Sequence, residues 1–451
     1  MSTLNVAVVG SGPAGMYLVE ALHKLLPRLA VDVIERLPTP FGLVRSGVAP
    51  DHASVRAIAQ RFEQVLDRPG VRFAGGVEVG RDIGLTQLRE LYDVVVLAHG
   101  CPVDKALGIP GEHLPGVWGS ARFTGWYNAH PDHAGSGATD LPRTVIVLGN
   151  GNVAIDVARL LTKSQIDLAA TDMHPAAVQV LGRSNVQKVM LVGRRAPIDA
   201  RFSVKELEEL ADVANVSVAL PAGVSLPTDA ELDALPPAQG AMLRALRTRA
   251  TNHSRHDRLA NIEFQFLARP AEVLGTARVE GMRFERMVQA RSGLQGTGQF
   301  FDVACGAVVS CIGFQARLLA GLRMEPTRGG LANNDALIDA NLYCTGWARR
   351  GPSGTIATNR TDASQVARRI ASEVRARGTP GPAGLDAVLK RLGTRCVDVA
   401  DWRAIDVAER GLAFGAAPRR RFHAVADMLQ FLSDRAIPPS PLHTTRIEEL
   451  P

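Results

Sequence analysis

The 451-residue chain contains one Gly-rich turn pattern twice, each time between an apolar strand and an amphipathic helix. The first copy is GSGPAG at residues 10–15, and the second is GNGNVA at residues 149–154. In such a turn the first glycine allows a tight bend, the second lets the backbone approach a pyrophosphate, and the third position packs the helix against the strand. The helix N-terminus adds partial positive charge. Two copies predict two doubly wound α/β domains, each binding a dinucleotide.

The residues around the first turn predict a site for the ADP half of FAD. An apolar run over residues 4–9 enters the turn with Gly10, Gly12 and Gly15, and a helical pattern follows. The next strand, over residues 31–34, ends in Glu35. A carboxylate at this point accepts hydrogen bonds from ribose hydroxyl groups.

The second turn predicts NADP(H) rather than NAD(H). Its strand covers residues 144–148, and the following strand, over residues 189–192, ends in Gly193, Arg194 and Arg195 instead of an acidic residue. A carboxylate there would repel a 2′-phosphate. Two guanidinium groups instead offer it charge-assisted, fork-shaped hydrogen bonds.

Composition excludes several other classes of protein. No two cysteines form a CxxC pair, which excludes dithiol reductases and zinc or iron–sulfur sites of the CxxC type. The net charge of +6 comes without a nucleic-acid-binding motif, so we expect no nucleic-acid partner. The sequence contains no run of 18 or more apolar residues, so it predicts no membrane span. A strand beginning at Leu4 leaves no room for a targeting peptide, so we expect a cytoplasmic protein. The five cysteines are Cys101, Cys305, Cys311, Cys344 and Cys396.

The order of these patterns predicts a domain interrupted by another. Residues 1–102 form the first part of an FAD-binding domain, and residues 103–330 form the NADP-binding domain. Residues 331–451 return to the FAD-binding domain with a strand near residue 342 and a long helix from about residue 355. They end in a C-terminal extension after a Gly/Pro-rich linker at residues 378–384.

Three strings resemble the adrenodoxin reductase family of ferredoxin–NADP reductases, including its bacterial members. They are LPTPFGLVRSGVAPDH at residues 37–52, GNGNVAIDVAR at 149–159 and GWARRGPSGTIATN at 346–359. The resemblance runs in register from Val6 to about Leu432 and is weakest between residues 213 and 298. It implies a glutathione-reductase-like fold, with the FAD domain split around the NADP domain.

The resemblance also assigns cofactor contacts. The FAD site would contain Ala14, Glu35, Leu43 and Val79, with Trp347, Gly354, Thr355 and Ile356 near the isoalloxazine ring. The NADP pyrophosphate would meet Asn150, Gly151, Asn152 and Val153, its 2′-phosphate Arg194 and Arg195, and its adenosine ribose Glu206. On physical grounds, Gly354 leaves room for nicotinamide to stack on flavin. The helix that follows directs its positive end toward the flavin.

By the same resemblance, NADPH would deliver hydride to FAD, and the flavin would pass single electrons to a ferredoxin, with no metal required. His52 and Glu209 would lie near the redox centre and handle protons or orient the nicotinamide. Other interpretations remain open. His52 could instead cap the helix that follows it. Glu209 could be a surface carboxylate, because Glu206 and Glu208 compete for its role.

Ferredoxins are generally acidic, so a basic run with Arg244, Arg247 and Arg249 is a candidate docking site, with Arg255 and Arg258 beyond it. A solvated charged helix explains that run equally well, and residues 419–421 are a weaker candidate. An NADPH diaphorase or quinone reductase, and a non-catalytic NADP-binding redox sensor, are the alternative functions. The sequence leaves open which ferredoxin is used, the direction of electron flow, the oligomeric state and the role of the C-terminal extension.

Overall fold

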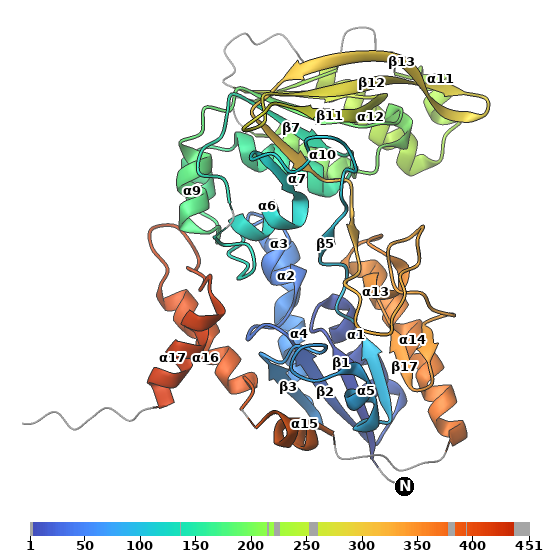
Figure 1. Ribbon diagram of the computed structural model, residues 1–451, viewed down its shortest axis with the longest axis vertical. Helices are drawn as coiled ribbons and strands as arrows, with labels where there is room; N and C mark the ends of the chain where they lie inside the picture. Colours follow the sequence, from blue (N-terminus) through green and yellow to red (C-terminus); the bar gives the residue numbers. More distant parts are fainter. Residues whose placement is uncertain are drawn as a thin grey trace, which may run out of the picture.

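The computed structural model describes residues 3–135, 137–213, 216–220, 226–251, 260–377, 384–393 and 395–436. Two six-stranded sheets with flanking helices, parallel except for the edge strand of one, lie one above the other along the long axis (Figure 1). This arrangement confirms the predicted α/β class with two dinucleotide-binding units. No helix in the described part of the chain is long and apolar enough to cross a membrane.

The lower sheet in Figure 1, here called the first sheet, takes strands from both ends of the chain. Its central strand β1 is almost wholly buried, as expected for a parallel sheet covered on both faces. Residues beyond 330 add the edge of the sheet next to β4. Its order is β16 (Leu337–Asp339), β17 (Leu342–Cys344), β4 (Val94–Leu97), β1 (Leu4–Val9), β2 (Leu29–Glu35) and β3 (Val71–Gly75).

The second sheet lies wholly within the middle of the sequence, and all its neighbouring strands are parallel. Its order is β6 (Val117–Gly119), β14 (Ala307–Ser310), β7 (Thr144–Leu148), β8 (Lys188–Val192), β10 (Ala260–Gln265) and β9 (Val216–Ala219). The antiparallel strands β11 (Ala268–Leu274), β12 (Gly281–Ala290) and β13 (Gly293–Ala304) lie beside it, at the top of Figure 1.

The chain passes between the two sheets twice, and the two passages pair with each other. Strand β5 (Val103–Asp104) leaves the first sheet, and β15 (Phe314–Gln315) returns to it antiparallel to β5. The domain boundaries near residues 102 and 330 remain a prediction. The position of this paired crossing, and the distribution of strands between the sheets, support them.

The C-terminal helices α16 (Val399–Gly411) and α17 (Val425–Ala436) lie beside the lower half of the molecule, and the loop between them extends toward the upper half (Figure 1). Just before α17, buried Arg421 forms an ion pair with buried Asp172 of the middle segment. Arg56, which ends α3 (Ala53–Arg56), donates to both oxygens of Asp172 at 2.7 and 2.8 Å. Burial acts to raise the Asp172 pKa, but the two guanidinium groups outweigh it, and the pKa is lowered. Three distant parts of the chain therefore meet at one carboxylate.

This network corrects the weaker docking hypothesis for residues 419–421. Arg421 is 8% exposed and also donates to the carbonyl oxygen atoms of Arg45 and Asn128. Arg419 forms an ion pair with Asp406. Arg421 therefore holds the C-terminal extension against the rest of the protein, and Arg419 is paired within the extension, so neither offers free charge to a partner.

We expect Asp172→Ala to lower the free energy of unfolding by about 3 kcal/mol or more, because it leaves two buried guanidinium groups without their shared anion. Denaturant unfolding of the FAD-loaded protein measures this loss. The matched control is Asp67→Ala, which breaks an ion pair with Arg403. The side chains of Asp67 and Arg403 are 53% and 48% exposed. Such a pair contributes about 1 kcal/mol at most. Equal losses in the two variants would contradict the role assigned to Asp172.

Candidate functional site

The three glycines of the first turn have different physical reasons for being glycine. Gly10 has a φ of 107°, and a Cβ there would lie 2.7 Å from the Ala98 backbone. A Cβ on Gly15 would lie 2.1 Å from the Gly10 carbonyl oxygen. Gly12, at the start of α1 (Pro13–Leu25), has an ordinary φ of −69°, and its Cβ would meet no atom within 4 Å. Gly10 and Gly15 are therefore needed by the fold, whereas Gly12 leaves open space where a pyrophosphate would lie.

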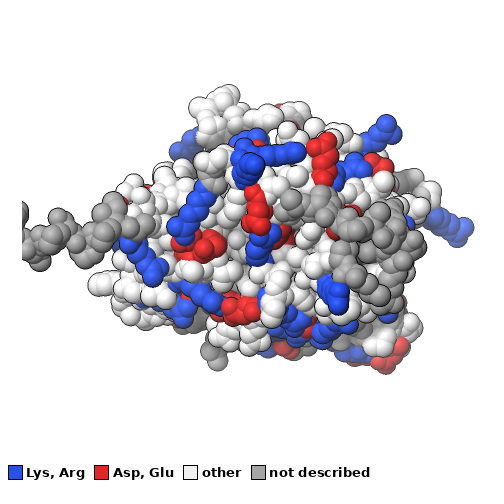
Figure 2. Space-filling model, turned by 90° about the horizontal axis from the view of Figure 1, so that it is seen from below, with Lys and Arg blue, Asp and Glu red and all other residues white. Residues whose placement is uncertain are grey.

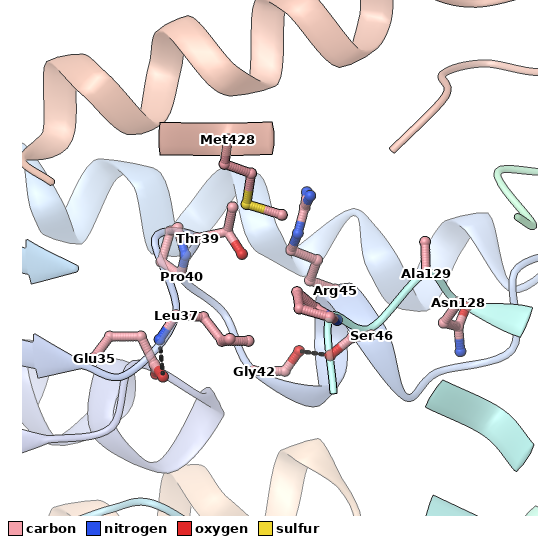
Figure 3. A pocket seen from close by; sticks show the side chains of 11 residues that line it. Glu35, Leu37, Thr39, Pro40, Gly42, Arg45, Ser46, Asn128, Ala129 and Met428 are labelled. Carbon is pink, nitrogen blue, oxygen red and sulfur yellow. Dashed lines mark hydrogen bonds between the residues drawn. The ribbon is translucent and has the colours of Figure 1, made fainter. Parts of the chain in front are cut away.

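Glu35 ends β2 directly beside this turn. Its carboxylate accepts hydrogen bonds from the Ser11 backbone N–H at 3.0 Å and the Ser11 hydroxyl at 2.7 Å. A small pocket opens next to it, lined by the loop after β2, by residues 128–131 and by Met428 of α17 (Figure 3). Glu35 is thus held at the end of β2, as a ribose ligand requires. Its role remains a prediction.

The other residues assigned to the FAD site differ in exposure. Ala14 and Val79 are buried. Leu43, at the start of the short helix α2 (Leu43–Ser46), has 46% of its surface exposed although it is apolar. An exposed leucine at this position fits a surface that a cofactor covers.

At the predicted flavin end, a buried carboxylate that the sequence analysis missed organises the turn after β17. Asp362 of α14 (Ile356–Arg377) is 3% exposed and accepts hydrogen bonds from the Thr345 hydroxyl at 2.9 Å and from the Gly346 N–H. Arg349 donates to its second oxygen at 2.8 Å. The sequence carries no local signal for this role, because the partners of Asp362 at residues 345–349 come close to it only through tertiary packing.

Gly354 and Thr355 are exposed and directly precede α14, which begins at Ile356, close to the helix start predicted near residue 355. Gly354 has a φ of 80°, and a Cβ there would approach Thr358 to 2.7 Å. The Thr355 N–H donates to the Thr358 hydroxyl at 3.1 Å. Nearby, the Trp347 indole N–H donates to the Ser353 carbonyl at 3.1 Å, and its ring stacks on Phe314. The positive end of a 22-residue helix and a fixed indole therefore lie together, which suits an anionic reduced flavin.

The second turn repeats the geometry of the first. Gly149 has a φ of 129°, with the Cys311 carbonyl 2.4 Å from its hypothetical Cβ. Gly151 meets nothing within 4 Å. The Asn150 side chain lies where a Cβ of Gly193 would be, and its Oδ1 is buried without a hydrogen-bond partner among the described residues. Half-buried Val153 follows in the helix.

Asn152 is held in place by the loop that precedes helix α10 (Val204–Ala211), because its Oδ1 accepts the Ser203 N–H at 3.0 Å. Arg194 and Arg195 follow β8 and are exposed. Within the described residues neither arginine has an ion-pair partner. They are therefore available to a phosphate, which is what an NADP(H) site needs.

The structure brings His52 and Glu209 together although 157 positions separate them in the sequence. His52 Nε2 lies 2.7 Å from the Glu209 carboxylate, which is on α10. His52 stands at the N-cap of α3, but its side chain makes no capping hydrogen bond, so the helix-capping interpretation is wrong. Glu209 is 31% exposed and engaged by His52, so it is not a free surface carboxylate.

Glu206 belongs to the same cluster. Its Oε2 is buried without a hydrogen-bond partner in the part of the chain that the structure describes, 3.9 Å from His52 Nε2. Burial, followed by the negative charge of Asp156, raises the Glu206 pKa to about 7. Its predicted contact with the adenosine ribose remains untested, and in this structure its neighbour is His52.

Two further charges complete the cluster. Asp51 is buried, yet its pKa falls to about 2 because Arg159 and Lys163 pair with it. Although His52, Glu206 and Glu209 have ligand-type atoms within 4.8 Å of one another, the Arg159 guanidinium lies 2.9 Å from the same His52 nitrogen. A cation there would face that positive charge, so we assign no metal. The cluster is suited to holding and moving a proton.

The predicted docking arginines lie on or at the end of helix α12 (Pro237–Thr251), and each faces an acidic residue. Arg244 pairs with Asp233, and Arg247 pairs with Asp229. Arg249 lies 3.5 Å from Asp212. Arg255 and Arg258 lie outside the described residues. The run is therefore less positive than its sequence indicates.

We expect Gly151→Val to fold and retain FAD but to bind NADPH at least tenfold more weakly, because a side chain there would meet no protein atom within 4 Å and would fill the space predicted for the pyrophosphate. Flavin absorbance and the KM for NADPH measure the two effects. Gly149→Val is the contrasting variant, since a side chain there meets backbone, and it should lose stability as well. An unchanged KM in folded Gly151→Val would place the pyrophosphate elsewhere.

Glu206→Gln should stabilise the protein more at pH 8 than at pH 5. The raised pKa means that the folded state holds this proton more tightly than the unfolded chain, whose ordinary value is 4.5. Wild-type stability should therefore fall as the pH rises from about 4.5 to about 7, a loss that glutamine avoids. Thermal unfolding at both pH values measures the difference. Glu208→Gln, an exposed neighbour, should show no such pH dependence.

Comparison with known proteins agrees with this geometry. Residues 4–230 match the family of pyridine nucleotide-disulphide oxidoreductases. The chain is 36% identical to NADPH-ferredoxin reductase FprA of Mycobacterium tuberculosis, over 95% of this chain and 99% of the relative. It is also 36% identical to human mitochondrial NADPH:adrenodoxin oxidoreductase, over 95% and 92% of the two chains.

The solved structure of Mycobacterium tuberculosis FprA in complex with NADPH superposes with a TM-score of 0.90 at 34% identity. The match covers 96% of this chain and all of that one. Both glycine turns, the arginine pair and the split first sheet thus occur in a chain that is similar to these reductases over nearly its whole length. The chain belongs to the family of NADPH-ferredoxin reductases and NADPH:adrenodoxin oxidoreductases.

Proposed function

We propose that this protein is an FAD-dependent ferredoxin–NADP reductase. This proposal rests mainly on the two glycine turns, in each of which the central glycine has open space beside it. Only after the second turn does the next strand end in two exposed arginines. One turn thus fits the pyrophosphate of FAD and the other that of NADP(H). When bound, the flavin accepts a hydride from NADPH and passes electrons singly to an iron–sulfur ferredoxin.

The protein's own residues orient the cofactors and manage charge. The start of α14 directs the positive end of its helix dipole toward the flavin, and Asp362 fixes the neighbouring turn by accepting the Gly346 N–H. His52 and Glu209 lie at the junction of the two halves, where a proton can be held on His52 Nε2. These roles in catalysis are proposals, supported by the 2.7 Å contact between the two side chains.

For the partner, we propose docking of an acidic ferredoxin on α12 through Arg244, Arg247 and Arg249. The ion pairs with Asp229, Asp233 and Asp212 reduce the attraction that these arginines can exert. The lower face of the molecule mixes basic and acidic side chains and has no large area of one sign (Figure 2). The part of this face that Figure 2 shows therefore has no docking surface for an acidic ferredoxin that is more strongly basic than α12.

An NADPH diaphorase or quinone reductase is the second candidate function, since it would use the same NADPH half-reaction with another acceptor. A non-catalytic redox sensor is less well supported, because it would need neither the exposed Gly354 before α14 nor the contact between His52 and Glu209. We also propose a cytoplasmic location. The five cysteines are free thiols, which fits a reducing compartment.

Replacing Arg194 and Arg195 by alanine should remove most of the preference for NADPH over NADH. Each lost charge-assisted hydrogen bond is worth roughly 1.5–3 kcal/mol, or about tenfold or more in affinity. The ratio of kcat/KM for the two nucleotides measures the effect, and kcat/KM for NADH should stay near the wild-type value. A double variant that discriminates as well as wild type would locate the phosphate site elsewhere.

The acceptor is tested by anaerobic NADPH reduction of the purified yellow protein, followed by addition of candidate ferredoxins or a neutral dye. Ferredoxin reduction should slow as salt rises, because steering between charged surfaces is screened beyond a Debye length of about 10 Å at 0.1 M. Dye reduction should depend less on salt. A protein that reduces quinones and dyes but no ferredoxin would support the second candidate function.

Changing Arg244 and Arg247 to Glu should slow ferredoxin reduction and leave dye reduction near the wild-type rate. Asp229→Asn with Asp233→Asn is the matched opposite variant, since it frees the same arginines from their ion pairs. It should therefore speed association with an acidic ferredoxin. If neither double variant changes the rate with ferredoxin, docking occurs elsewhere.

A further inference from the structure

Arg159 contacts three side chains at the junction of the two halves: Asp51, His52 and Asp156. It lies on α7 (Asn152–Thr162), the helix that follows the second glycine turn, and is 3% exposed. Its NH1 pairs with Asp51, which belongs to the loop before α3 on the other half of the molecule. Because Arg159 ties that loop to α7, it also determines what surrounds His52, the next residue in the chain.

The NH2 group of Arg159 has more acceptors than hydrogens. Asp156 Oδ1 lies at 2.9 Å, His52 Nε2 at 2.9 Å and Asp51 Oδ1 at 3.1 Å, while the group carries two N–H bonds. The Nε–H of the same guanidinium is buried without a partner among the described residues. One of the three acceptors must therefore go without an Arg159 hydrogen bond.

His52 Nε2 faces the complementary conflict. It lies 2.9 Å from Arg159, which can only donate, and 2.7 Å from the Glu209 carboxylate, which when ionised can only accept. A ring nitrogen carries either a hydrogen or a lone pair, never both. His52 Nε2 can thus bond Glu209 or Arg159, but not both at once.

We propose that Arg159 is a positioning residue that selects the hydrogen-bond partner of His52 Nε2. When Asp51 and Asp156 take both NH2 hydrogens, Arg159 leaves His52 to donate its Nε2–H to Glu209. When either carboxylate stops accepting, the freed N–H favours the other His52 tautomer, in which the ring hydrogen lies on Nδ1 and the Nε2 lone pair accepts from Arg159, and the bond to Glu209 is lost. This inference rests on the proposed function, because the His52–Glu209 contact matters through hydride transfer from NADPH.

Burial raises the Asp156 pKa, despite the neighbouring Arg159, so this carboxylate can lose its charge more readily than Asp51, whose pKa is about 2. Protonation of Asp156 would therefore release an Arg159 hydrogen toward His52. The charged and titratable groups around His52 come from three elements: Asp51 from the loop before α3, Asp156, Arg159 and Lys163 from α7 and its C-cap, and Lys205, Glu206 and Glu209 from α10.

The test is nitrogen NMR of the FAD-loaded protein with labelled histidine, in which the His52 signal is identified by its absence from His52→Gln. At neutral pH the wild-type signal should show a hydrogen on Nε2. In Asp156→Asn the weaker amide acceptor should release Arg159, and Nε2 should lose its hydrogen. NADPH-dependent flavin reduction should then slow by about tenfold or more, with little change in the KM for NADPH.

Asp51→Asn should change the Nε2 signal in the same direction and replaces Asp156→Asn if that variant fails to fold. In an Arg159→Lys background, Asp156→Asn should no longer move the signal, because lysine lacks the fork that links the three acceptors. Lys163→Gln is the control, since Lys163 contacts Asp51 without a hydrogen bond to His52, and its signal should match wild type.

A His52 signal without a hydrogen on Nε2 in the wild type would overturn the proposal. It would also be overturned if Asp156→Asn and Asp51→Asn leave the signal unchanged, or if Lys163→Gln moves it equally. The NMR result does not depend on the acceptor or on turnover. A failure of the reductase function would therefore be seen in the NADPH assays and would leave this measurement interpretable.

Discussion

The contact between Gly346 and Ala14 is the constraint on which the rest of the structure depends. A Cβ on Gly346 would lie 2.3 Å from the Ala14 Cβ, so only a glycine lets the turn after β17 pack against the start of α1. This contact joins two points 332 residues apart in the sequence. The first sheet is completed by strands from the C-terminal part of the chain, so the middle segment must leave this sheet and return to it. The paired strands β5 and β15 make these two crossings.

The turn that makes this contact also accounts for the burial of Asp362. Gly346 has a φ of 65°, and its N–H points at the Asp362 carboxylate, which Arg349 also approaches. A buried carboxylate is costly unless it is hydrogen-bonded and paired, and here both conditions are met. The charge therefore fixes the turn that carries Trp347, and so the predicted flavin site is held from both ends of the chain.

The fold and cofactor sites could be predicted from sequence where the signal is local. Glycine spacing between a strand and a helix specifies a dinucleotide-binding turn. The residues at the end of the next strand then indicate which dinucleotide is bound: Glu35 indicates FAD, and Arg194 and Arg195 indicate NADP(H). The role of Asp362 was not predicted, because tertiary packing brings its partners at residues 345–349 close to it, and local sequence patterns do not show such packing. The charge of α12 was overestimated for a related reason: Asp229, which pairs with Arg247, lies on another helix, α11 (Asp229–Asp233).

The junction of the two halves shows why such pairings decide function. His52 and Glu209 come from different halves, so their contact exists only when the halves are correctly placed. The Asp172 network and the Asp51–Arg159 pair both hold that placement, but they differ in consequence. Asp172 is surrounded by two arginines whose charges keep it ionised. Arg159 instead has three acceptors for two hydrogens, one of them His52. The Asp172 network can only stabilise the placement of the two halves. The arrangement around Arg159 can also respond to a proton, so we place any chemical control at Arg159 and not at the C-terminal extension.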